Sequence, residues 1–160
     1  MRKRPTIERT PTTRAVASPI GLLTVLSVSP LEEDHVSIQT IIGHSTWMMF
    51  QARDVASALA LLRRHEIAVV ICERDLLPET WIDVLEHLNT LPKAPPLIVT
   101  SRLADERLWA EALNLGAWDV LVKPLDRLEL IRSVKLAWDH WHMQTHTAVG
   151  KSMSAAVEAK

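Results

Sequence analysis

Five short apolar runs alternate with segments of helical periodicity, and this alternation limits the possible folds more than any other feature of the sequence. The apolar runs cover residues 22–28, 47–52, 68–73, 97–101 and 118–122. The helical segments cover residues 31–43, 54–65, 81–91, 104–116 and 123–142. Strands that alternate with helices over short loops form a parallel sheet with right-handed crossovers. The sequence therefore predicts an α/β domain with a doubly wound, five-stranded parallel sheet.

Composition and charge set the expected boundaries of this domain. The chain has 160 residues and is 48% hydrophobic, which is sufficient for one core. Residues 1–20 are basic and poor in large apolar side chains, so they are expected to form a disordered tail. The domain is expected to occupy residues 21–144, with residues 145–160 as a second disordered tail. This division leaves no room for a DNA-binding output domain, so a stand-alone domain is expected.

Several functional classes are disfavoured by composition. The formal net charge is −1, which gives no general attraction to nucleic acid. No apolar run approaches the roughly 20 residues that span a bilayer, and the single cysteine, Cys72, fits a reducing compartment. The chain has only four glycines and no glycine-rich phosphate loop. We therefore expect a cytoplasmic protein with no membrane contact and no flavin or nucleotide cofactor.

The polar residues that follow the predicted strands are the candidates for a functional site. In doubly wound sheets, ligands and reactive groups lie at the carboxyl ends of the strands. The residues at these positions are Ser29 and Pro30, Glu73, Thr100 and Ser101, and Lys123. Parallel strands bring all of them to the same edge of the sheet.

The segment TSRLADERLWAEALNLGAWDVLVKPLDRLEL resembles the fourth and fifth βα units of the receiver domain of two-component response regulators. The shared features are Thr100 and Ser101 after a strand, a Gly-Ala pair at residues 116–117, and Lys123 followed by proline. The resemblance covers residues 22–142 and implies a flavodoxin-like fold. It also implies an aspartate after the third strand that accepts phosphate, an acidic pair after the first strand that binds Mg²⁺, and a lysine that holds the phosphoryl group.

The sequence departs from the family pattern at its chemical positions. Ser29 and Pro30 occupy the places of the acidic pair, and Glu73 occupies the phospho-acceptor position. Val120 stands where family members carry an aromatic residue used in switching. The acidic run at residues 32–34 is interpreted as the negative start of a helix. Because Mg²⁺ requires several converging oxygen atoms, no metal site is expected.

Glu73 and Lys123 are predicted to form an ion pair, because a carboxylate at the end of a buried strand requires a charged partner. One hypothesis is a pseudo-receiver without enzymatic activity, held in one state by this pair and independent of phosphorylation. A second hypothesis is an inactive switch that serves as a scaffold. The alternative is a conventional receiver that accepts phosphate on a non-standard carboxylate, such as Asp75, with Mg²⁺.

The expected partners of this domain are other proteins. Trp109 lies on the predicted helix 104–116, at a position that family members use for contacts, and Trp118 could extend the same patch. Large aromatic side chains are frequent anchors of interfaces. The resemblance implies a signalling partner such as a histidine kinase, or a homodimer through the fourth helix, fifth strand and fifth helix.

Overall fold

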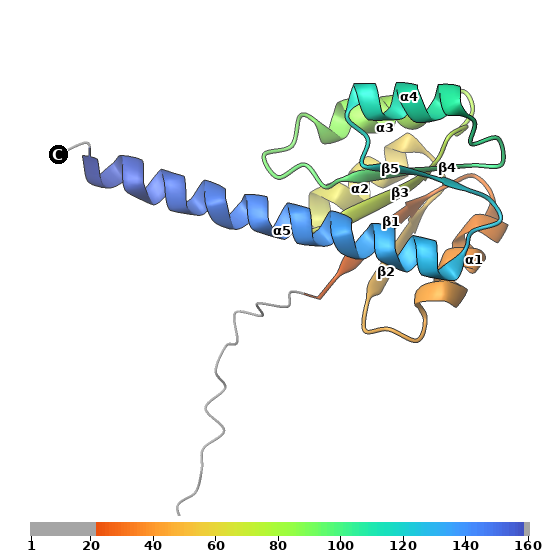
Figure 1. Ribbon diagram of the computed structural model, residues 1–160, viewed down its shortest axis with the longest axis horizontal. Helices are drawn as coiled ribbons and strands as arrows, with labels where there is room; N and C mark the ends of the chain where they lie inside the picture. The colour runs from red at the N-terminus through yellow and green to blue at the C-terminus, as the bar shows by residue number, and fades with distance from the viewer. Residues whose placement is uncertain (1–21, 159–160) are drawn as a thin grey trace, which may run out of the picture.

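The protein forms one five-stranded parallel sheet, and the predicted fold class is confirmed. The computed structural model describes residues 22–158, with side-chain environments up to residue 144. The strands are β1 (Thr24–Val28), β2 (Met48–Ala52), β3 (Val69–Glu73), β4 (Leu97–Ser101) and β5 (Asp119–Val122). The helices are α1 (Glu32–Ile42), α2 (Val55–Arg64), α3 (Trp81–Leu88), α4 (Glu106–Leu115) and α5 (Arg127–Glu158). The strand order is β2-β1-β3-β4-β5, so β3 lies at the centre (Figure 1).

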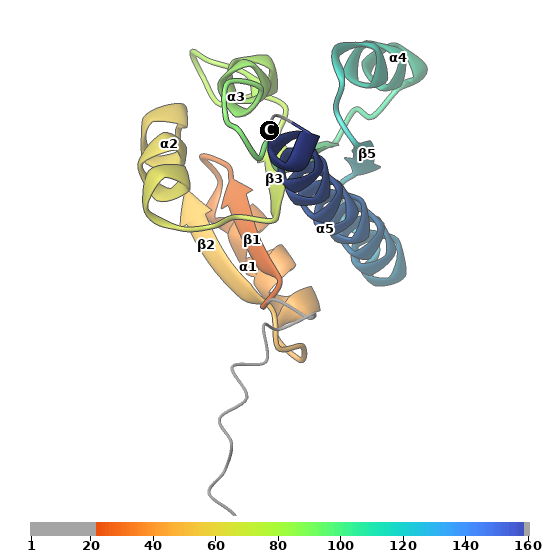
Figure 2. The same ribbon diagram turned by 90° about the vertical axis from the view of Figure 1, so that its left-hand side faces the viewer.

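Helices cover both faces of the sheet. Helices α1 and α5 pack on one face, and α2, α3 and α4 pack on the other (Figure 2). The strand side chains alternate between these two cores, as the two-residue period of a strand requires. In β3, Val69 and Ile71 join the core under α1 and α5, whereas Val70 and Cys72 join the core under the other three helices. This two-sided burial explains why the strands are continuously apolar.

Local sequence signals fix where several helices begin and end. The carboxylates of Asp54 and Asp105 accept hydrogen bonds from backbone N–H groups at the starts of α2 and α4. Thr80 and Asp83 form a reciprocal capping box at the start of α3. Gly116 ends α4 with a φ of 102°, a left-handed conformation that glycine adopts without steric cost. Strands and helices are therefore joined by short, defined loops.

The predicted end of the last helix is wrong. Helix α5 continues to Glu158, whereas residues 145–160 were expected to be disordered. The expectation was based on the end of the apolar stripe, which reports burial rather than helix formation. The sequence from 145 to 158 contains three alanines and no proline, a composition compatible with a helix. The predicted basic tail, residues 1–20, lies outside the described residues.

The strand register brings the candidate residues to one edge. Thr100 lies opposite Glu73, and Val122, the residue before Lys123, lies opposite Ser101. The backbone N–H of Lys123 donates to the Ser101 carbonyl at 2.9 Å, so the sheet pairing extends into the loop after β5. Across the described part of the chain, no helix is long and apolar enough to cross a membrane.

Candidate site at the carboxyl ends of the strands

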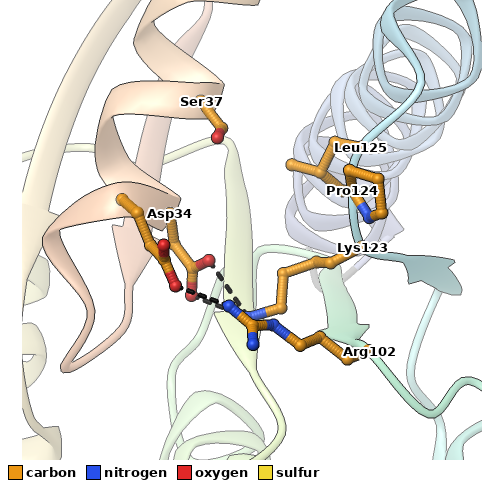
Figure 3. A pocket seen from close by; sticks show the side chains of 7 residues that line it. Asp34, Ser37, Arg102, Lys123, Pro124 and Leu125 are labelled. Carbon is orange, nitrogen blue, oxygen red and sulfur yellow. Dashed lines mark hydrogen bonds and ion pairs between the residues drawn. The ribbon is translucent and has the colours of Figure 1, made fainter.

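The centre of the site is the ammonium group of Lys123, which lies between two carboxylates. Lys123 Nζ is 2.9 Å from Asp34 Oδ2 and 3.0 Å from Asp34 Oδ1 (Figure 3). The same nitrogen forms an ion pair with Oε2 of Glu73. All three side chains are about 9% exposed. The ion pair between Glu73 and Lys123 that the sequence predicts is thus present, but it has a third member.

Asp34 is the functional residue that the sequence analysis missed. The acidic run at residues 32–34 was interpreted as a favourable helix start, and Glu32 and Glu33 are indeed exposed. Asp34 instead is buried and points toward Lys123. It shares one face of α1 with Ile38 and Ile42, at steps of four residues, and both are core residues. This continuation of the buried stripe was the signal that could have identified Asp34.

Ser29 holds Asp34 in place. Its hydroxyl group donates to Asp34 Oδ2 at 2.6 Å and accepts from the Leu31 backbone N–H at 3.1 Å. Ser29 is the residue predicted to occupy an acidic position of the family pattern, and its hydroxyl group binds the carboxylate of Asp34 on α1.

His35 is buried beside this turn and fixes it to β1. Its Nε2–H donates to the Ser29 carbonyl oxygen at 2.9 Å, because a carbonyl can only accept. In the neutral ring Nδ1 then accepts from the Ser27 hydroxyl at 2.8 Å. Hydrogen bonds therefore run from Ser27 in the sheet through His35 to the Ser29 backbone, and from the Ser29 hydroxyl to Asp34.

The pKa of Lys123 is raised above its ordinary value of 10.5. Burial by itself lowers this pKa, but hydrogen bonds to Glu73 and Asp34 and the negative charges of both carboxylates outweigh burial. Lys123 is therefore positively charged at neutral pH, as its position between two carboxylates requires.

The residues present do not fit a magnesium ion. Pro30 has no oxygen in its side chain, and the Ser29 hydroxyl is occupied by Asp34. The ammonium of Lys123 occupies the space between Asp34 and Glu73, where a cation would have to lie. Among the described residues, no group of three acidic, histidine or cysteine side chains has the arrangement of a metal site. Mg²⁺ requires near-octahedral oxygen coordination, which this set cannot provide.

The other predicted site residues lie near this centre without contacting the ammonium in any described interaction. The Thr100 hydroxyl is 3.5 Å from the Cys72 carbonyl oxygen, and the Ser101 hydroxyl accepts from the Leu103 N–H at 3.1 Å. Val120 is buried in the core under α2, α3 and α4. Asp75, the alternative acceptor, is exposed in the loop after β3. Its Oδ1 lies 3.8 Å from Nε of Arg74.

A pocket of about 310 Å³ opens beside the site. Its walls come from α1, from the loop after β4 and from the loop after β5 (Figure 3). Arg102 donates to Glu33 at 2.7 Å, and both residues line the pocket. Both side chains are well exposed, so this pair adds little stability, and no pattern in the sequence predicts it.

The two candidate interface tryptophans differ in exposure. Trp109 on α4 is 42% exposed. Trp118 is partly buried against the core under α1 and α5, and its ring lies 4.9 Å from the ring of His140. Trp109 is thus available for contacts, whereas Trp118 offers only part of its surface.

The comparisons with known proteins place these observations in a family. Residues 33–135 match the family model described as "Response regulator receiver domain". The chain belongs to the response regulator receiver domain family. A signal receiver domain of an HD domain-containing protein from Pseudomonas fluorescens Pf-5 superposes with a TM-score of 0.71 at 26% identity, covering 78% of this chain and 92% of that one.

Curated relatives of this receiver domain are longer proteins. The transcriptional regulatory protein ZraR of Salmonella typhimurium is 28% identical over 115 residues, which are 68% of this chain and 25% of the relative. The Regulator of RpoS of Escherichia coli K12 is 31% identical over 86 residues, which are 54% of this chain and 26% of the relative. The chain thus spans about a quarter of the length of these relatives. It is a receiver domain of two-component signalling.

Removing the ammonium should destabilise the receiver domain more than removing either carboxylate. Lys123→Met leaves Asp34 and Glu73 buried without a cation, and we expect a loss of about 3 to 5 kcal/mol in the free energy of unfolding. Glu73→Gln and Asp34→Asn should each cost less, because Lys123 keeps one carboxylate. Denaturant unfolding followed by tryptophan fluorescence measures all three, and equal losses would contradict a shared ammonium.

The stabilisation by Lys123 should disappear at alkaline pH. The pKa of Lys123 is raised in the folded state, so its full contribution to the free energy of unfolding is present below its ordinary pKa of 10.5. That contribution is lost as the pH rises through the pKa of Lys123 in the folded protein. The difference in unfolding free energy between wild type and Lys123→Met should therefore be constant from pH 8 to about 10 and then shrink.

The effect of Cys72 on stability has to be removed from both proteins in this comparison. Burial and the charge of Glu73 raise its pKa well above 9.0, so Cys72 also reduces stability as pH rises. Both proteins should therefore carry Cys72→Ala. The chain has no tyrosine, so no phenol titrates in the same range. A difference that stays constant above pH 11 would contradict the raised pKa of Lys123.

Proposed function

We propose that this receiver domain signals without phosphorylation, as a non-enzymatic pseudo-receiver in the cytoplasm that acts through protein contacts. The observation that carries the proposal is the ammonium of Lys123 bound by Asp34 and Glu73. In a phosphorylated receiver the lysine would hold the phosphoryl group, as the family resemblance implies. Here its hydrogen-bonding capacity is already used by two buried carboxylates.

The acceptor position supports the same proposal. Glu73 carries its carboxylate one methylene further than aspartate would, and this reach brings the carboxylate to Lys123. It supplies one negative charge and two oxygens, fewer than a phosphorylated aspartate does. We infer that it holds the domain permanently in one state. A phosphoryl group on Glu73 would have to displace Lys123 without a magnesium ion to neutralise its charge.

The switching residues also favour a fixed state. Val120 is small, buried and surrounded by core residues, so no aromatic ring can rotate there between two positions. A ligand or modification shifts a conformational equilibrium only if a second state interacts with it more favourably. The proposed domain therefore offers one surface to its partner at all times.

Phosphorylation is tested directly by mass. The protein should be incubated with a small phosphodonor and Mg²⁺, and its intact mass measured over time. We expect no phosphorylated species, because the acceptor aspartate and the metal ligands are both missing. Glu73→Asp is the matched variant, and it should also remain unmodified because Ser29 and Pro30 still bind no metal. Phosphate on wild-type Glu73 or Asp75 would overturn the proposal in favour of a conventional receiver with a non-standard acceptor.

The partner surface is tested at Trp109, on the surface formed by α4, β5 and α5. We expect Trp109→Ala to lose proteins that the wild type captures from cells, or to lose dimerisation, because it removes an exposed aromatic anchor. Affinity capture measures the loss of bound proteins, and sedimentation measures the loss of dimerisation. Leu22→Ala is the control, since Leu22 is also exposed but precedes β1, which is separated from β5 by β3 and β4. Equal behaviour of the two variants would exclude Trp109 as the anchor.

A further inference from the structure

A second cavity lies at the end of the sheet opposite to Lys123, beside α5. Its volume is about 290 Å³. Its walls come from the segments before β1 and β2 and from the middle of α5, and they include Leu22, Leu23, Trp47, Lys135, Trp138 and Asp139. The backbone N–H of Met48 donates to the Leu23 carbonyl at 2.9 Å, so the starts of β1 and β2 lie side by side at this cavity.

The inner wall of the cavity is apolar and aromatic. Leu23 is buried in the core under α1 and α5, and the side chains of Trp47 and Trp138 pack against the same core. Leu22 is 53% exposed. An apolar group that enters the cavity would therefore contact two indole side chains and cover part of an exposed leucine, which is favourable in water.

The wall formed by α5 adds one charge of each sign. Lys135 and Asp139 are exposed and four residues apart, so they lie on the same face of the helix as Trp138. Among the residues whose side chains the structure describes, neither forms an ion pair with the other or with a third group. An ammonium and a carboxylate are thus both available to a ligand beside the aromatic wall.

We propose that this cavity binds a free hydrophobic α-amino acid. The α-carboxylate of the ligand pairs with Lys135, and its α-ammonium pairs with Asp139. Its apolar side chain contacts Trp47 and Trp138. No group of the ligand reacts, so the site is one of binding alone.

The size and the charges of the cavity favour this class of ligand. A volume of about 290 Å³ is at the lower end of the roughly 300 to 1,000 Å³ of ligand pockets, so the cavity suits a small molecule. A ligand with a single charge would be repelled by either Lys135 or Asp139, whereas an amino acid complements both. The flexible four-carbon side chain of Lys135 allows its ammonium to adjust to a ligand that Asp139 holds.

This inference goes beyond the proposed function, because it assigns a small-molecule site to a domain proposed to act through protein contacts. The length of a five-residue strand, about 16 Å, separates the two ends of the sheet. Occupation of the cavity therefore requires no change in the ion pairs of Lys123.

The test uses the full chain and four probes. L-Phenylalanine has both charges and a ring, 2-phenylethylamine lacks its carboxylate, 3-phenylpropanoate lacks its ammonium, and glycine lacks its ring. Calorimetry measures the affinity of each probe, and the indole N–H signals of Trp47 and Trp138 locate the site. We expect phenylalanine to bind at least about tenfold more tightly than each of the other three and to shift both indole signals, because each missing group removes a charged hydrogen bond or apolar burial.

Substitutions assign each charge to its partner. Lys135→Met should weaken the binding of phenylalanine to about that of 2-phenylethylamine, whose own affinity should not fall. Asp139→Asn should likewise remove the preference for phenylalanine over 3-phenylpropanoate. Both side chains are exposed, so the unfolding midpoints should stay unchanged. A merely structural role of Lys135 or Asp139 would instead weaken all probes alike.

Arg107→Met and Glu111→Gln are the matched controls. Arg107 and Glu111 are also exposed and have the same order of charges and the same spacing of four residues. They lie on α4, which packs on the other face of the sheet. Neither substitution should alter the affinity for phenylalanine.

Three results would overturn the proposal. The first is no binding of phenylalanine, or binding that leaves the indole signals of Trp47 and Trp138 unchanged. The second is equal affinity for phenylalanine and the probes that lack one of its groups. The third is tighter binding in Ile20→Ser, which would assign the cavity to this chain's own residues before β1. Each result leaves the phosphodonor experiment unaffected, so failure here is distinguishable from failure of the proposed function.

Discussion

The ammonium of Lys123 between Asp34 and Glu73 joins three separate parts of the chain. Asp34 is in the first turn of α1, Glu73 ends β3, and Lys123 follows β5. Each of these charges alone would be costly to remove from water, by several kcal/mol per ion. Together they offset much of that cost, and Ser29 adds a hydrogen bond to Asp34. The pairing therefore fixes the start of α1 and the loops after β3 and β5 relative to one another.

The parts of this arrangement that follow from strand position were predictable from the sequence. Glu73 and Lys123 each come directly after an apolar strand, and parallel strands bring their carboxyl ends together. The two-residue period of the strands and the apolar stripes of the helices gave the order of elements. Helix ends were less predictable, because an apolar stripe ends where burial ends. Helix α5 shows the difference, since it continues to Glu158, beyond the end of its apolar stripe in the sequence.

Asp34 and Arg102 could not be assigned in the same way, for two different reasons. Asp34 belongs to an acidic run in which helix rotation, and not residue type, decides which carboxylate is buried. Only its four-residue spacing from Ile38 separates it from Glu32 and Glu33. Arg102 pairs with Glu33 across 69 residues of sequence, between the loop after β4 and the first turn of α1, and no local pattern brings these two segments together. Contacts of this kind depend on the assembled fold.

The fold and the site chemistry of this domain have diverged to different extents. The sheet, its two cores and the Gly-Ala and Lys-Pro motifs retain the receiver pattern at 26% identity to a solved receiver domain. Under the proposed function, the acidic pair, the aspartate and the aromatic switch residue of the family pattern are replaced by Ser29 and Pro30, Glu73 and Val120. Core positions require only apolar side chains of suitable size, whereas phosphate chemistry requires particular oxygen ligands. A shared fold therefore does not imply a shared reaction.

A receiver domain that cannot change state must convey information by other means. In a phosphorylated switch, the signal is the fraction of molecules in the active state, and this fraction changes without new protein synthesis. Under the proposed function that fraction is constant, because no ligand or modification distinguishes two states. The remaining variables are the concentration of the domain and that of its partner, which together set the amount of complex by mass action. The affinity of the preformed surface then determines the concentration range over which the signal is transmitted.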